Sequence, residues 1–120
     1  MKKELFVVLL MAIPAIVGLG TCFDHSSSAP AVCSLGPDQE HVFYRGVNGQ
    51  LMHVYWTLQN GWMSQAQDMG APSVGFQGAP AALSRSPSVL NVYVWGNDNR
   101  IWTRSFFDGS WHNWAVLGAT

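Results

Sequence analysis

Short apolar and β-branched runs alternate with polar turn residues along most of the chain. The runs have the length and composition of strands, with apolar positions that either alternate or are continuous. Clusters of Gly, Asn and Asp separate them, as is typical of turns in β-hairpins. The clearest strand candidates are HVFYRG (41–46), QLMHVYW (50–56), NVYVWG (91–96) and RIWTRSF (100–106). We therefore predict an all-β chain.

A repeat relates the two halves of this pattern. A shift of fifty residues aligns residues 29–57 with 79–107, and seven of the 29 pairs are identical. A shift reduced by one residue then pairs Trp62 with Trp111, and a second reduction by one residue pairs Gly70 with Gly118. Periods of this length are typical of solenoids, propellers and arrays. We predict two units, residues 28–77 and 78–120.

Each unit has four strand candidates, which is the content of one β-propeller blade. A small Ala/Pro/Ser-rich strand opens each unit, PAVCS (30–34) and PAALS (80–84). Such a strand suits the innermost position of a blade, where there is little room for side chains. A β-sandwich built by tandem duplication is the alternative. The predicted fold is all-β, with two four-stranded antiparallel blades that form an incomplete ring.

The first residues have the order of a secretory signal peptide. Lys2 and Lys3 precede an apolar run over residues 5–17, and small residues follow. We predict a signal peptide over residues 1–21, a linker over 22–27, and a secreted or cell-surface protein. A permanent N-terminal anchor is the alternative.

Two cysteines follow the predicted signal peptide. In an oxidising compartment Cys22 and Cys33 could form a disulfide. Alternatively, Cys22 in the stretch LGTC is lipidated, as in bacterial lipoproteins, and Cys33 is a small buried apolar residue. The sequence leaves both possibilities open.

The charge of the chain argues against nucleic acid as a partner. After residue 21 there are four Arg, no Lys and six Asp or Glu, without a basic run. Nucleic-acid binding requires a positive footprint on the protein surface. We therefore expect no nucleic-acid partner and no membrane binding by charge.

The two units resemble the repeat of the PLL-type bacterial lectins. The first unit carries APAVCSLGPDQEHVFYRGVNGQLMHVYW and GWMSQAQDMG, and the second carries APAALSRSPSVLNVYVWGNDNRIWTRSF and SWHNWAVLG. The resemblance implies a propeller that binds fucose and O-methylated sugars between neighbouring blades. Two positions depart from the pattern: Trp95 replaces an Arg and Gln65 replaces a Trp.

The resemblance also implies a ring of seven blades, whereas this chain contains two. Two blades alone would expose broad aromatic faces, which mark an interface or an aggregation hazard. We therefore expect a homo-oligomer, a ring of three or four copies. The alternative is a piece of a longer propeller protein.

Six residues are candidates for carbohydrate binding. His41 and His53 have the same strand parity and would face the same side of the first hairpin. Asn91 and Thr103 are their counterparts in the second unit, and all four offer neutral hydrogen-bonding groups. Trp62 and Trp111 would stack on the apolar C–H faces of a sugar. The alternative roles are structural hydrogen bonding for the histidines and packing between blades for the tryptophans.

Catalytic signatures are absent from the sequence. There is no GxSxG, no HExxH and no Gly-rich phosphate loop. No third ligand accompanies His41 and His53, so we expect neither a metal site nor a cofactor. We predict a non-enzymatic, lectin-like protein whose partners are glycans. The alternative is a structural or protein-interaction module.

Overall fold

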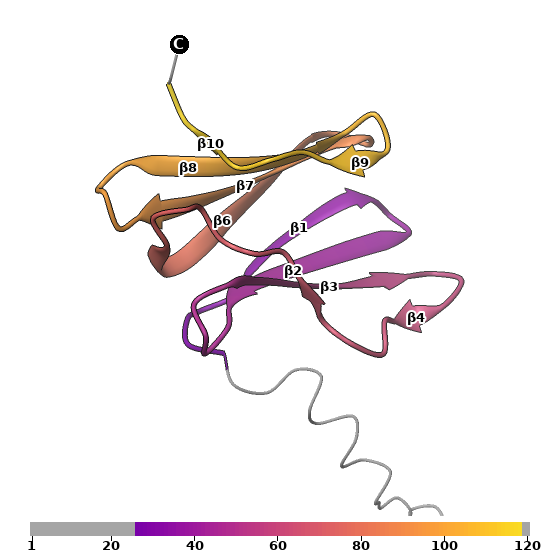
Figure 1. Ribbon diagram of the computed structural model, residues 1–120. Coiled ribbons are helices and arrows are strands. Elements are labelled where there is room, and N and C mark those ends of the chain that lie inside the picture. The colour runs from indigo at the N-terminus through magenta and orange to yellow at the C-terminus, as the bar shows by residue number, and fades with distance from the viewer. Residues whose placement is uncertain (1–25, 119–120) are drawn as a thin grey trace, which may run out of the picture.

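The computed structural model of the 120-residue chain describes residues 26–118, which form two antiparallel sheets and contain no helix (Figure 1). The predicted signal peptide, most of the predicted linker and Cys22 lie outside these residues, so these predictions remain untested. The described residues include no helix long and apolar enough to cross a membrane.

The first sheet contains five strands in chain order. They are β1 (Ala31–Gly36), β2 (Gln39–Arg45), β3 (Leu51–Thr57), β4 (Gly61–Trp62) and β5 (Gln67–Asp68). Strands β1, β2 and β3 pair as an antiparallel meander, and both β4 and β5 pair with β3. The outer position of this sheet is therefore shared by two short strands.

The second sheet has the same arrangement. Its strands are β6 (Phe76–Ser86), β7 (Val89–Gly96), β8 (Ile101–Phe107), β9 (Ser110–Trp111) and β10 (Ala115–Val116). Both β9 and β10 pair with β8. The fold prediction of two antiparallel, blade-like sheets that do not close a ring is confirmed.

The fourth predicted strand of each unit is divided because it carries extra residues relative to its partner strand. In the first sheet, residues 63–66 lie opposite residues 54–55 of β3. In the second sheet, residues 112–114 lie opposite residues 104–105 of β8. The surplus residues have no partners in the ladder of hydrogen bonds, so they interrupt it.

Equivalent positions of the two sheets have the same backbone geometry. Gly49 and Asn99 both have positive φ, at 86° and 63°, in the central hairpin turn. In the identical pair Gly46 and Gly96, a side chain would crowd Gln50 and Met52 at Gly46 and would collide with its neighbours at Gly96. A Cβ on Gly96 would lie 2.6 Å from Cδ1 of Trp102. The repeat in sequence is thus a repeat in structure.

The hydrophobic core lies between the two sheets, which face each other as layers in Figure 1. The first sheet and the segment that follows it contribute Phe43, Leu51 and Met69 to this core. The second sheet contributes Phe76, Leu90, Val92 and Val94. Since every member is at most 3% exposed, neither sheet can bury these side chains without the other.

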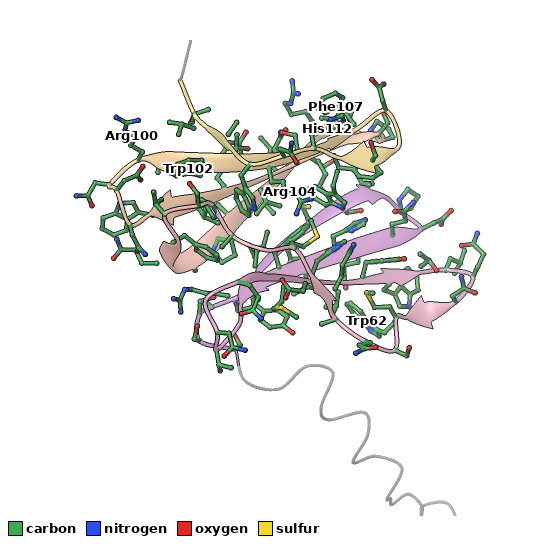
Figure 2. The ribbon with its side chains drawn as sticks, in the orientation of Figure 1. Trp62, Arg100, Trp102, Arg104, Phe107 and His112 are labelled. Carbon is green, nitrogen blue, oxygen red and sulfur yellow. The ribbon has the colours of Figure 1, made fainter. Side chains whose placement is uncertain are left out.

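Two arginines tie the sheets together at the backbone. Nε of Arg45 donates to the carbonyl of Phe76 over 3.0 Å. Nη1 of Arg104 donates to the carbonyl of Met69, and Figure 2 shows Arg104 between the sheets. Charge-assisted hydrogen bonds of this kind are stronger than neutral ones, and they fix the relative placement of the two blades.

Replacing a core leucine tests this arrangement. Leu51 is fully buried, so Leu51→Ala should lower the free energy of unfolding by about 2–5 kcal/mol through lost burial and a residual cavity. Leu58 is 62% exposed in the turn after the same strand, and Leu58→Ala should change it by less than about 0.5 kcal/mol. Urea unfolding followed by circular dichroism measures both values. Equal effects of the two substitutions would contradict a core between the sheets.

Candidate functional site

The candidate site is a cavity of about 550 Å³ at the junction of the two sheets. Its walls come from both blades. The first sheet and its loops contribute Leu35, Gln39, His41, His53, Tyr55, Thr57 and Gln67. The second sheet and its turns contribute Pro87, Ser88, Leu90, Phe106, Gly109 and Trp111. The volume is in the usual range for small-molecule sites.

Stacked rings on β2 and β3 contribute His41, His53 and Tyr55 to the wall of this cavity. Residues of the same strand parity point to one face, so His41 and Phe43 on β2 meet His53 and Tyr55 on β3. The rings of His53 and Phe43 lie 4.5 Å apart at 6°, and those of His53 and His41 lie 5.2 Å apart at 11°. Tyr55 stacks beside both histidines.

Trp111 reaches this stack from the other sheet. Its ring meets His53 edge-on at 5.8 Å and Phe43 at 5.9 Å. It also contacts Phe106 of its own sheet at 5.5 Å. Trp111 is therefore both a packing residue at the junction and part of the cavity wall.

A chain of hydrogen bonds joins four residues of the cavity lining. Oε1 of Gln39 lies 3.1 Å from Nε2 of His41, and Nδ1 of His41 lies 2.9 Å from Nε2 of His53. Nδ1 of His53 lies 3.1 Å from Oε1 of Gln67. Each contact joins groups that both line the cavity, so the chain decides which donors and acceptors a ligand meets.

The number of protons in this chain limits its arrangement. Three hydrogen bonds that end on two carbonyl oxygens need three ring protons, but two neutral imidazoles carry only two. Burial lowers the pKa of His53 to about 4 and also lowers the pKa of His41. Since both rings are then neutral near pH 7, either Gln39 or Gln67 must turn its amide nitrogen toward a ring. The other amide then accepts from its histidine.

The structure brings together three of the six predicted carbohydrate-binding residues. His41, His53 and Trp111 line the cavity. Asn91, Thr103 and Trp62 are not among its lining residues, and Trp62 lies on the side of the first sheet that faces away from the second (Figure 2). Asn91 is buried and bonds to Ser105 and Arg85 of its own sheet, whereas Oγ1 of Thr103 is buried without a partner.

Sequence reasoning missed Gln39, Tyr55 and Gln67 as cavity residues. Gln39 and Tyr55 stand two positions from His41 and His53, so strand parity could have identified both. Gln67 follows the surplus residues of the divided outer strand, and its register against His53 depends on how many residues leave the ladder. Sequence alone does not give that number.

The remaining predictions concern a metal site and the two cysteines. No group of three or more potential metal-binding side chains occurs within residues 26–118. Cys33 is half-buried and packs against the core, and this burial raises the pKa of its thiol. Its predicted disulfide partner Cys22 is outside the described part of the chain, so the state of the pair stays a prediction.

The chain is similar to a repeat family and to a lectin of known structure. A family model described as "Repeat of unknown function (DUF346)" matches residues 39–82. A fucose lectin from Kordia zhangzhouensis in complex with methyl-fucoside has 18% sequence identity and a TM-score of 0.50, and the match covers 81% of this chain and 70% of that one. A search of curated proteins gave no match.

These comparisons relate part of the chain to a described repeat and its fold to that of a lectin. The family match spans β2 to the middle of β6, so it includes parts of both blades. At 18% identity, the likeness to the lectin concerns the fold. Part of the chain is thus similar to a described repeat, and its fold is similar to that of a sugar-binding protein.

The buried histidines predict that stability falls in acid. The folded state holds His53 neutral to a pKa of about 4, whereas the unfolded chain takes up the proton near its usual pKa of 6.5. The stabilising contribution is therefore complete above about pH 6.5, falls as the pH drops toward 4, and amounts to at most about 3 kcal/mol. Urea unfolding at pH 7 and pH 5 should show this loss.

A matched pair of variants isolates the effect of His53. His53→Gln should reduce the difference in the free energy of unfolding between the two pH values. His112→Gln, between β9 and β10 of the second sheet and outside the cavity lining, should preserve it. Equal pH dependence in the parent and in His53→Gln would contradict the assignment to this buried ring.

Proposed function

We propose that the chain is a carbohydrate-binding module that holds a neutral sugar in the cavity between its two blades. The observation that carries this proposal is the combination of aromatic walls with convergent neutral polar groups in one cavity. The C–H faces of a sugar pack on aromatic rings, while its hydroxyls require hydrogen-bonding partners. Tyr55 and Trp111 supply the rings, and Gln39 and Gln67 supply amides.

The lining favours an uncharged ligand. Among the described residues that form the cavity wall, none is Asp, Glu, Lys or Arg. Low pKa values keep His41 and His53 uncharged at neutral pH. An acidic sugar or a phosphate would lose its hydration here without gaining a charged partner.

Apolar side chains in the same cavity support fucose or an O-methylated sugar. Leu35, Leu90 and Phe106 share the cavity with the polar groups. The methyl group of a 6-deoxy sugar or of a methyl ether can be buried against such side chains. The lectin of similar fold is in complex with methyl-fucoside, which makes this glycoside the first ligand to test.

The same lining supports binding rather than hydrolysis as the activity. Most glycoside hydrolases place two carboxyl groups beside the scissile bond. The residues around this cavity offer amides, imidazoles and hydroxyls in their place. Together with the order of charges and apolar residues at the N-terminus, this supports an exported lectin that meets glycans outside the cell.

A titration with methyl-fucoside tests the proposal. Gln67→Ala removes an amide from the cavity and should weaken binding by about 2- to 10-fold, the usual effect of one hydrogen bond. Gln65→Ala changes the same residue type two positions earlier, outside the cavity lining, and should leave affinity unchanged. Isothermal titration calorimetry measures both, and free fucose should compete.

The alternative is a structural module in which the junction serves only packing. This reading is favoured by the ring contacts of Trp111 with Phe43, His53 and Phe106, which would exist without a ligand. A folded protein that binds no neutral sugar on a glycan array would support the structural module and overturn the lectin proposal.

A further inference from the structure

The repeat gives the chain two different outer faces. The face of the first sheet that meets the second carries His41, Phe43 and Leu51. We call residues at equivalent positions of the two repeat units mates. The mates of these three residues are Asn91, Tyr93 and Ile101, which share one face of the second sheet. That face points away from the first sheet. Conversely, the inward residues of the second sheet have their mates on the outer face of the first.

Exposed apolar residues on these outer faces are mates of residues at the junction. Ile101 is 42% exposed while its mate Leu51 is fully buried, and Leu117 is 55% exposed while its mate Met69 is 3% exposed. Trp62 is 48% exposed, whereas its mate Trp111 packs between the sheets.

Two further pairs follow the same rule. Val32 and Leu83 are 56% and 50% exposed, and their mates Ala82 and Cys33 pack against the core. The outer faces therefore carry apolar side chains equivalent to those at the junction, but within residues 26–118 no other sheet packs against them.

The hydrogen bonds of the backbone support this alignment. The amide of Met69 donates to the carbonyl of Leu51, and the amide of Leu117 donates to the carbonyl of Ile101, each over 2.8 Å. Trp62 pairs with Trp56 in the first sheet as Trp111 pairs with Phe106 in the second. The mates thus occupy equivalent structural positions.

Charged residues on the two outer faces are complementary. Leu35 and Leu90 line the same cavity from opposite sheets. Their mates are Arg85 on the outer face of the second sheet and Glu40 on the outer face of the first, and both are exposed. If the junction is repeated between chains, a pair of opposite charges replaces the two leucines.

We propose that a second copy of this chain packs head to tail on the outer face of the second sheet and reproduces the junction found within one chain. Arg85 of one copy then faces Glu40 of the next. A contact between two different faces forms a ring when its rotation closes. Propellers have typically four to eight blades, so roughly two to four copies would complete one.

The same contact would complete a second cavity. Asn91 and Thr103 are the mates of His41 and His53, and Trp62 is the mate of Trp111. In one chain they lie on opposite outer faces, but in the proposed contact Trp62 of the second copy approaches Asn91 and Thr103 of the first. That this cavity also takes a sugar rests on the proposed function.

Charge reversal tests the contact without any sugar. The full chain should sediment as one discrete assembly of roughly two to four copies. Glu40→Arg and Arg85→Glu should each weaken association by roughly tenfold or more because like charges then face each other. The double variant should restore association, since the pair is re-formed with its signs exchanged.

Leu58→Arg provides the control. It adds a positive charge at an exposed turn of the first sheet. Its mate Asp108 is exposed rather than buried at the junction, so Leu58 should lie outside the contact between copies, and association should not change. A monomeric parent chain would overturn the proposal, and so would single reversals that leave association intact.

Calorimetry with methyl-fucoside separates this inference from the proposed function. The assembly should bind two sugars per chain, and the dissociated Glu40→Arg variant should bind one. An assembly that binds no sugar would refute the lectin proposal and leave the head-to-tail contact standing. A monomer that binds one sugar would do the reverse.

Discussion

Burial of large side chains between two sheets is the interaction on which this structure depends. Each sheet is a small meander that is too thin to enclose its own apolar residues. Phe43 and Leu51 on one side and Leu90 and Val92 on the other become inaccessible only because the sheets face each other. The cavity is lined by residues of both sheets, so the forces that stabilise the fold also set the geometry of the candidate site.

Two buried histidines lie in the part of this contact that opens into the cavity. His41 and His53 are almost fully buried, but each ring has its nitrogens paired with a neighbour in the chain of hydrogen bonds. Paired in this way, the rings avoid the cost of unsatisfied polar atoms and remain rigid. The cavity therefore presents fixed hydrogen-bonding directions rather than mobile side chains.

Much of the architecture could be predicted from the sequence because the repeat carries strong local signals. The Gly-containing hairpin turns and the alternating strands at 41–56 and 91–106 determine the sheets. Parity correctly grouped His41 with His53, and the repeat linked Trp111 to Trp62. What the sequence could not show is that equivalent residues face opposite ways relative to the junction: Trp111 enters the cavity while Trp62 faces outward. That distinction arises from stacking one sheet on the next, a long-range arrangement that local patterns do not encode.

The interrupted outer strands have a consequence for how such sheets avoid aggregation. A long, straight edge exposes a row of unpaired amides and carbonyls that can recruit a strand from another molecule. Here the outer position of each sheet is divided into the two-residue strands β4 and β5, or β9 and β10. The two outer borders therefore offer no continuous template for amyloid-like growth, and only the opposite edges, β1 and β6, are continuous strands.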